Sequence, residues 1–537
     1  MVPPAAQVAR RSGSFGTSLG LRLARPHAKV GGIAQRRSPV ENLMRVMVTY
    51  PPLKGKGSPM LTQNRQFQWF HEPSYLYPCV PASAATLLQS LGHEVLWNDC
   101  IAEQKDMSQF LRLLRDFKPE LVAMETKSPV VRQHWALTEM IKAEVPGVKV
   151  VLFGDHISGN PTETMEKSQV DYCITGGDYD FSLESLVNHI TKGDALDGGF
   201  YYRNSDGTHG TTGPYKGTRS LEELPYMDRH LTNAHLYFEK WKKRLPFLWT
   251  MAGRDCPYGK CTFCSWTVTY PRFNTVSPEH LCNEMDMLIS KHGAREIFDD
   301  TGALPGGNWL NRLCTEMIDR KINEKVIFDC NFRFDYFTEK NVQLMKKAGF
   351  RTLILGIESA SERTIDILDK DLTREVIIEG CRMASAAGLQ PHLTMMVGYP
   401  WETKEDAYET LKLARYLMHN GLAHHLQATV VMPYPGTPLF RLCQENGWIR
   451  FDETEYERYD MTEPVCVLTD MNQEEVVQMA GQFYKLYLHP KFLAHQLQHL
   501  NSLEDLDYMT RGAKAIWGHI KDFAKIRTWD GVPAQAK

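Results

Sequence analysis

Short apolar runs alternate with amphipathic stretches from residue 45 to about residue 195. Helical spacing of apolar residues marks two of the intervening segments, "PASAATLLQSLG" and "MSQFLRLLRDF". Strands that alternate with helices of this length predict βαβ units and a parallel sheet. We therefore predict an α/β, doubly wound Rossmann-like domain over residues 44–195, with ligands at the carboxyl ends of its strands. The predicted strands are 45–52, 93–99, 120–126, 149–156 and 171–177.

A second alternating series begins near Pro246, after a Gly- and Asn-containing stretch (196–245) that predicts a hairpin or linker. Six βα units predict a partial (β/α)6 TIM-like barrel over residues 246–440, with its active site at the carboxyl ends of the strands. Residues 441–537 predict a helical C-terminal region. The six predicted strands are 247–254, 296–301, 326–333, 352–359, 391–399 and 426–433.

Composition is that of a globular protein, with 43% hydrophobic residues, 23% charged residues and a formal net charge of −3. No strongly basic domain indicates nucleic-acid binding. The twelve cysteines among 537 residues are mostly scattered, which excludes a secreted disulfide framework and favours a reducing, cytoplasmic environment. No apolar run approaches the roughly 20 residues that a membrane-spanning helix needs. We expect a soluble chain with no transmembrane segment.

The first forty residues differ from the rest of the chain, because they contain seven Arg or Lys and no acidic residue before Glu41. This composition is compatible with an organelle transit peptide. A disordered basic tail, or an upstream start codon with Met44 beginning the folded protein, explains it equally simply. On any of these interpretations, residues 1–43 are a basic leader outside the fold.

Three cysteines lie within "RDCPYGKCTFCSW", directly after the first predicted barrel strand. Cys256, Cys261 and Cys264 have a C-x4-C-x2-C spacing, which suits three thiolate ligands of a 4Fe-4S cluster with the fourth iron open. A structural zinc site is the alternative, and it normally needs four ligands. Cys282 is a candidate fourth ligand, although it lies in a predicted helix.

The segment from about 246 to 440 resembles the core of radical S-adenosylmethionine (SAM) enzymes, in which a cysteine loop follows the first strand of a partial barrel. Phe263 matches the aromatic residue before the last cysteine in the family pattern C-x3-C-x-aromatic-C. The first gap here has four residues instead of three, and Gly259 could absorb the extra residue in a wider turn.

The resemblance implies SAM contacts at the ends of further strands. They are Phe263 in the cysteine loop, Asp300 in "FDDTG", Arg333 in "NFRFD", Glu358 in "GIESASE" and Gly398 in "MMVGYPWET". Each residue also has an ordinary structural explanation. Asp299 and Asp300 are compatible with a helix cap, Arg333 with a salt bridge and the glycines with turns.

Together, the two halves resemble cobalamin-dependent radical SAM enzymes from about Arg45 to Leu439. The resemblance implies cobalamin contacts at Gly154, His156 and Ser158 in "VVLFGDHISGNPTE", and at Gly176 in "DYCITGGDYD". Asp178 and Asp180 replace the glutamates of the usual G-E-x-E element. Because the chain lacks D-x-H-x-x-G, we expect cobalt without a protein imidazole ligand. The alternative is a Rossmann-like sheet that binds nothing and only braces the barrel.

The resemblance implies three cofactors, namely a 4Fe-4S cluster, SAM and cobalamin, and an electron donor such as flavodoxin or ferredoxin. It favours a methyltransferase that acts on an unactivated carbon of a small molecule or lipid, through a 5′-deoxyadenosyl radical and methylcobalamin. A non-methylating radical SAM cyclase or oxidoreductase and a non-catalytic iron–sulfur sensor are the alternatives.

Two features of the sequence concern the substrate, but neither identifies it. The aromatic residues near predicted strand ends are compatible with an apolar pocket or with core packing; they are Trp266, Tyr270, Trp309, Tyr399 and Trp401. The segment 485–500 has apolar residues at helical spacing opposite His and Lys. A helix packed on the barrel and a membrane-surface or lid helix both have this pattern.

Overall fold

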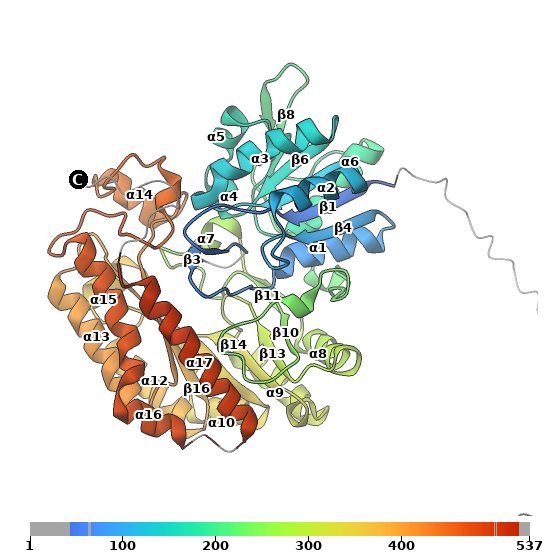
Figure 1. The fold of residues 1–537 in the computed structure, drawn as a ribbon. Helices are drawn as coiled ribbons and strands as arrows, with labels where there is room; N and C mark the ends of the chain where they lie inside the picture. The colour runs from blue at the N-terminus through green and yellow to red at the C-terminus, as the bar shows by residue number, and fades with distance from the viewer. Residues whose placement is uncertain (1–42, 63–65, 499, 501, 526–537) are drawn as a thin grey trace, which may run out of the picture. The chain divides into compact units, whose positions relative to one another are not determined.

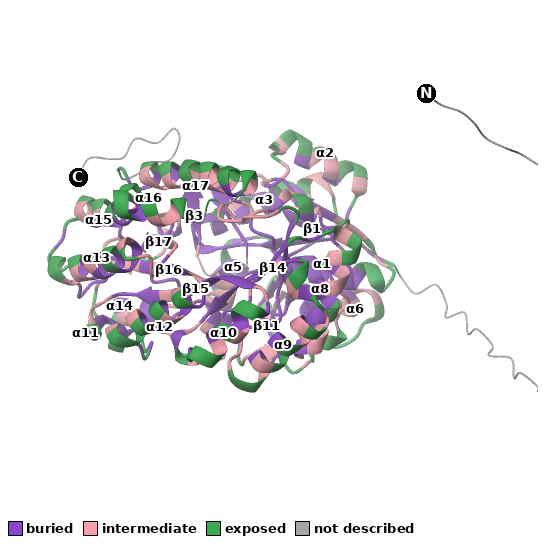
Figure 2. Cartoon of the chain, turned by 90° about the horizontal axis from the view of Figure 1, so that it is seen from below, coloured by how far each residue is buried: buried purple, intermediate pink, exposed green. Residues whose placement is uncertain are grey.

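The computed structural model describes residues 43–62, 66–498, 500 and 502–525. The predicted leader lies almost entirely outside these residues. The described chain contains two parallel sheets, one in each half, and most residues of their strands are buried (Figures 1 and 2). No described helix has the length and apolar character needed to cross a membrane.

The first sheet has the strand order β4-β1-β5-β6-β7-β8-β9, in which the first five strands are parallel. This arrangement confirms the predicted doubly wound sheet. The strands are β1 (Arg45–Tyr50), β4 (Glu94–Asp99), β5 (Leu121–Glu125), β6 (Lys149–Phe153) and β7 (Tyr172–Ile174). The helices are α1 (Cys79–Ser90), α2 (Met107–Phe117), α3 (Val131–Glu144), α4 (Asp155–Gly159), α5 (Pro161–Lys167) and α6 (Tyr179–Lys192).

Part of the predicted linker extends this sheet. β8 (Phe200–Arg203) pairs antiparallel with β7, and β9 (His209–Thr211) pairs antiparallel with β8. The hairpin predicted within 196–245 therefore belongs to the first sheet, and only the residues after it connect the two halves. A second small hairpin, β2 (Ser58–Met60) with β3 (Gln68–Phe70), follows β1.

The second sheet has six parallel strands in sequence order, which confirms the predicted partial barrel. They are β10 (Phe247–Thr250), β13 (Glu296–Asp299), β14 (Ile327–Phe332), β15 (Phe350–Glu358), β16 (Gln390–Val397) and β17 (His425–Val430). β11 (Gly253–Arg254) and β12 (Asn274–Thr275) form a short ladder beside the first strand. The helices are α7 (Trp266–Thr269), α8 (Pro278–His292), α9 (Gly307–Asp319), α10 (Glu339–Lys347), α11 (Glu362–Ile367), α12 (Arg374–Ala386) and α13 (Lys404–His419).

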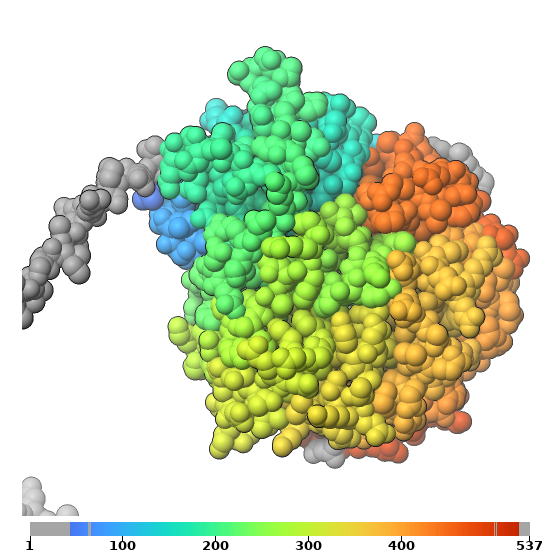
Figure 3. All heavy atoms as spheres, turned by 180° about the vertical axis from the view of Figure 1, so that it is seen from behind, coloured from blue at the N-terminus to red at the C-terminus, as the bar shows by residue number. Residues whose placement is uncertain are grey.

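The C-terminal region is helical, as predicted, with α14 (Pro438–Glu445), α15 (Gln473–Lys485), α16 (Pro490–Leu497) and α17 (Leu503–Asp522). α15 packs on β17, where the Tyr484 hydroxyl donates to the Ala428 carbonyl at 2.9 Å. The segment between α14 and α15 contacts the first domain, and Lys56 and Asp460 form a buried ion pair at 2.8 Å there. Figure 3 shows this orange segment against the cyan residues of the first domain.

Candidate active site

The cysteine loop lies at the carboxyl end of β10, where the barrel fold predicts the active site. Backbone hydrogen bonds hold it against two distant segments, from Thr262 N–H to the Leu368 carbonyl (3.0 Å) and from Leu439 N–H to the Thr262 carbonyl (2.9 Å). Gly259 has φ +61°, so the glycine in the longer first gap does make a left-handed turn. All three cysteines are partly exposed and line one cavity.

Two cations lie beside these thiols. Lys370 donates to the Glu358 carboxylate at 2.9 Å and interacts electrostatically with Cys261. Burial raises the pKa of the Cys261 thiol, and Lys370 opposes that rise. The Arg333 guanidinium stacks 3.8 Å from the centre of the Tyr258 ring within the loop and interacts with Cys256 and Cys261. Positive charge at this position favours thiolate ligands over thiols.

The alternative of a closed zinc site is not supported by the geometry. Cys282 is fully buried in α8, where its electrostatic partners include Arg320 and Glu316, and it interacts with Cys314 of α9. Within the described residues, no three Cys, His, Asp or Glu side chains are close enough to share one ion. A tetrahedral zinc ion would hold its thiolates about 4 Å apart. A cluster binds each thiolate on a different iron, so three loop thiolates suffice for it without a fourth ligand.

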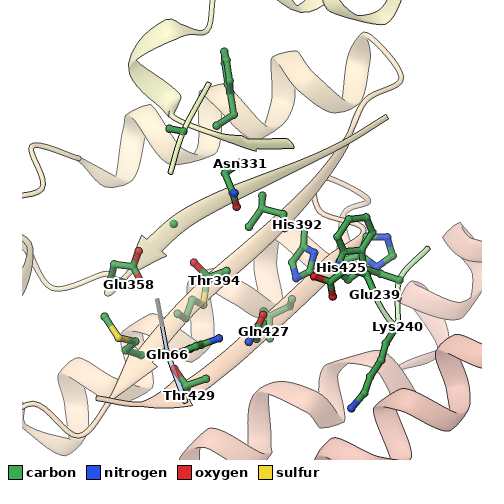
Figure 4. Close-up of a pocket in the computed structure, with 18 of the residues that line it drawn as sticks. Gln66, Glu239, Lys240, Asn331, Glu358, His392, Thr394, His425, Gln427 and Thr429 are labelled. Atoms are coloured by element: carbon green, nitrogen blue, oxygen red, sulfur yellow. The ribbon is translucent and has the colours of Figure 1, made fainter. Parts of the chain in front are cut away.

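A cavity of about 460 Å³ extends from the cysteines into the barrel (Figure 4). Its walls are mainly apolar and aromatic, from Trp241, Phe298, Phe332, Ile354 and Leu426. Polar side chains project from successive strands, as Figure 4 shows for Asn331, Glu358, Thr394, Gln427 and Thr429. A mostly apolar chamber with a few placed polar groups suits an organic substrate beside SAM.

The structure brings four of the five predicted SAM contacts to this cavity, namely Phe263, Asp300, Arg333 and Glu358. Gly398 does not line it. Its N–H donates to the Glu402 carboxylate at 2.6 Å, and a Cβ on Gly398 would lie 2.8 Å from Val476. Of the five singled-out aromatic residues, only Trp266 lines the cavity.

The two consecutive aspartates after β13 have different environments. Asp299 is fully buried and accepts hydrogen bonds from Thr250 Oγ1 (2.9 Å) and from the Ala252 N–H (2.8 Å). It therefore fixes the end of β10, from which the cysteine loop departs. Asp300 is partly exposed and lines the cavity. Alternation of side chains along an extended chain explains the division.

Sequence reasoning missed Glu239, which enters the cavity from the linker between the two sheets. Figure 4 shows its carboxylate beside His392 and His425. Burial raises the pKa of Glu239 to about 8, and Asp300 adds to the rise. The acidic residue within "YFEKW", flanked by aromatic residues in an otherwise polar linker, was the available signal.

The four predicted cobalamin contacts lie at the carboxyl edge of the first sheet, and none of them lines the cavity. Gly154 has φ +123°, and a Cβ there would lie 2.1 Å from the Thr126 carbonyl oxygen. The Tyr215 ring packs closely against Gly176 in the same way, because a Cβ on Gly176 would clash with it. The Gly176 N–H donates to Ser158 Oγ at 3.2 Å.

His156 lies at the centre of this edge. Its Nδ1 lies 3.0 Å from Ser128 Oγ, whereas the structure gives its buried Nε2 no hydrogen-bond partner among the described residues. Burial lowers the pKa of His156 to about 4. The packing of Thr126 and Tyr215 accounts for the two glycines. The unsatisfied imidazole nitrogen of His156 fits a polar ligand that lies across the strand ends.

A buried ion-pair cluster joins this edge to the cysteine loop. Arg254 lies two residues before Cys256, and its guanidinium contacts Asp178 (3.4 Å) and Asp180 (3.0 Å) at the end of β7. All three side chains are at most 5% exposed. The aspartates that replace the expected glutamates therefore position the loop. Burial raises the pKa of Asp178 to about 6, and Arg254 opposes that rise.

Comparison with known proteins agrees with this geometry. Residues 251–414 match the family model described as the Radical SAM superfamily. An uncharacterized methyltransferase of Pyrococcus horikoshii is 27% identical over 411 residues, which cover 75% of this chain and 86% of the relative. An anaerobic magnesium-protoporphyrin IX monomethyl ester cyclase of Rubrivivax gelatinosus is 22% identical, over 78% of this chain and 75% of the relative.

The fold extends the similarity beyond the barrel. The radical SAM methyltransferase TsrM from Kitasatospora setae, whose structure contains cobalamin and a [4Fe-4S] cluster, superposes with a TM-score of 0.61. That match covers 90% of this chain and all of TsrM at 14% identity, so it shows a shared fold. The cysteine loop, the barrel and the family match together indicate a radical SAM enzyme over residues 251–414, and the described chain shares the two-domain fold of TsrM.

Proposed function

We propose that this protein is a cobalamin-dependent radical SAM methyltransferase that modifies an unactivated carbon of a small molecule or lipid. One observation supports the proposal most directly. The cysteine loop opens into an apolar cavity, and Arg254 ties the same loop to the carboxyl edge of the Rossmann-like sheet. This ion pair supports a placement of the two predicted cofactor regions next to each other, as methyl transfer between them requires.

In this proposal Cys256, Cys261 and Cys264 hold three irons of a cluster, and Gly154, His156, Ser158 and Gly176 hold cobalamin. When bound, the cluster supplies the electron that cleaves SAM, and cobalamin carries the methyl group. Arg333 and Lys370 offset the negative charge of the thiolates, while Asp300 and Glu358 offer acceptors to the ammonium and hydroxyl groups of SAM.

The apolar part of the cavity wall limits the water near the reacting atoms. Phe298, Phe332 and Leu426 present apolar surface to the interior, and nothing in that surface competes as a hydrogen-bond partner. Electrons would come from a one-electron donor such as flavodoxin or ferredoxin. The similarity to a magnesium-protoporphyrin ester cyclase supports a second candidate, a radical SAM reaction without methyl transfer.

Trideuteromethyl-labelled SAM distinguishes the two candidates. The chain would be reconstituted anaerobically with iron, sulfide and cobalamin, reduced, and incubated with extracts that contain small molecules and lipids. A product heavier by the labelled methyl group, formed together with 5′-deoxyadenosine, supports methyl transfer. Formation of 5′-deoxyadenosine and a changed substrate without the label would favour the second candidate and contradict the proposal.

A further inference from the structure

The outer faces of α16 and α17 carry an apolar surface that no described element covers (Figure 2). On α17, residues 503, 506, 510, 513 and 517 repeat at helical spacing along one exposed face. Leu503 is 85% exposed and Trp517 is 58% exposed. Leu493 and Leu497 extend the surface onto α16, at 45% and 59% exposure. We call Leu493, Leu497, Leu503, Leu506 and Trp517 the apolar face.

The opposite side of α17 is anchored, so this exposure belongs to a folded helix. Tyr508 Oη lies 2.9 Å from His425 Nε2 on β17, and Lys243 pairs with Asp505 at 2.5 Å. Asp522 accepts a hydrogen bond from the His71 N–H at 3.0 Å. These contacts leave the leucines and Trp517 pointing away from the barrel.

The apolar face adjoins the reaction cavity. Phe492 and Leu493 of α16, and Met509, Gly512 and Ile516 of α17, all line the same chamber as the cluster cysteines. Leu493 belongs to both surfaces, since it is exposed and lines the cavity. The cavity therefore reaches the protein surface beside the apolar face.

The charges around this face favour an anionic partner. Residues 485–525 contain six Lys or Arg and four Asp or Glu. Glu504 pairs with Arg295 (2.8 Å), and Asp507 pairs with Arg511 (2.8 Å). Among the described residues, no ion pair of Lys485, Lys491 or Lys521 is present, and all three are exposed. Leucines and a Trp on one face with lysines beside them are typical of helices that lie in a membrane interface.

We propose that α16 and α17 dock on an anionic lipid bilayer, and that the substrate is a membrane lipid whose hydrocarbon chain enters the cavity between them. The substrate class rests on the proposed function, whereas the docking does not. A chain that passes from the bilayer directly into an apolar cavity avoids exposure to water, which explains why the cavity opens at this face. A second copy of the chain on this face would block the opening.

Vesicle flotation tests the docking. The full chain would be mixed with vesicles of phosphatidylcholine alone, or of phosphatidylcholine that contains phosphatidylglycerol. The bound fraction would be measured for wild-type protein and for Leu503→Glu/Trp517→Glu. We expect wild-type protein to float with anionic vesicles and the variant to lose about tenfold or more of its binding. Leu91→Glu/Val376→Glu, which changes exposed apolar residues at the C-cap of α1 and on α12, is the control and should float like wild type.

Wild-type protein that fails to float, or a variant that floats equally well, overturns the docking. A dimer in light scattering that the α17 variant abolishes also overturns it, in favour of a second copy. Formation of 5′-deoxyadenosine without vesicles is measured in parallel. If the α17 variant loses flotation but keeps this activity, the helix is a docking element. If wild-type protein forms no 5′-deoxyadenosine, that result contradicts the proposed function and leaves the docking unaffected.

Discussion

At the scale of single residues, the site separates groups that build the strand ends from groups that face the cavity. Asp299 fixes β10 through Thr250 and Ala252, while its neighbour Asp300 faces the chamber. Glu239 is the least expected of the cavity groups, because it comes from the linker and not from a strand. Its raised pKa indicates that it is protonated near neutral pH, when it can donate a hydrogen bond to a substrate oxygen.

The change Glu239→Gln tests this protonation without a known substrate. Burial raises the folded-state pKa of Glu239 from 4.5 to about 8, so the folded protein binds its proton more tightly than the unfolded chain. Stability contributed by this proton is present at low pH and is lost as pH rises from about 4.5 to about 8. The amide of glutamine does not titrate in this range, so the variant does not lose this stability as pH rises. The gain of the variant over wild type should grow by about 2 kcal/mol between pH 5 and pH 8.

Denaturant unfolding of anaerobic protein at several pH values measures this difference. The exposed Glu375→Gln on α12 is the matched control and should show no such trend. A pH-independent difference between Glu239→Gln and wild type would show that Glu239 is ionised in the folded protein and does not act as a donor.

The resemblance singled out the cysteine triad as cluster ligands, and the three cysteines line one cavity, while their metal binding stays a prediction. Phe263, Asp300, Arg333 and Glu358 were predicted from the same resemblance, and all four line that cavity. Gly398 was predicted in the same way, but its backbone amide bonds to Glu402 instead. Electrostatic interactions such as that of Asp300 with Glu239 join distant segments, and periodicity contains no information on them.

At the scale of elements, the β11 strand is one structural link between the two halves. Its Arg254 is buried against Asp178 and Asp180, and the cysteine loop begins two residues later. Both parallel sheets were predicted from apolar periodicity, whereas the strand order of the first sheet was not. The extension of the first sheet by β8 and β9 was not predicted either, because short polar strands have a weak pattern and depend on pairing with β7.

Replacing Arg254 with Met tests this link. The change leaves two buried carboxylates without their cation, and we expect a loss of about 3–5 kcal/mol in unfolding free energy. Arg382→Met is the matched control, because Arg382 forms a pair with Glu379 in which both side chains are 52% exposed. That change should cost less than about 1 kcal/mol.

Anaerobic denaturant unfolding of the two variants gives the comparison. Equal, small losses would indicate that Asp178 and Asp180 do not depend on Arg254 and that the cysteine loop is positioned by other contacts, such as the backbone bonds of Thr262.

At the scale of the whole described chain, the Rossmann-like domain, the barrel and the C-terminal helices each contribute to one chamber. The segment after β1 reaches it through Gln66, the strands supply its polar groups, and α16 and α17 form its outer wall. Figure 4 shows Gln66 near Glu358 and Thr429, although these residues are almost 300 positions or more apart in sequence. The proposed chemistry requires the three cysteines to provide the reactive centre of this chamber.

The most direct measurement is iron content together with SAM cleavage, in wild type and in Cys256→Ala/Cys261→Ala/Cys264→Ala. After anaerobic reconstitution and reduction, we expect about four irons per chain and formation of 5′-deoxyadenosine in wild type. The triple variant should lose both, and Cys282→Ala should lose neither. Zinc in place of iron, or a triple variant that retains its iron and still cleaves SAM, would contradict the account.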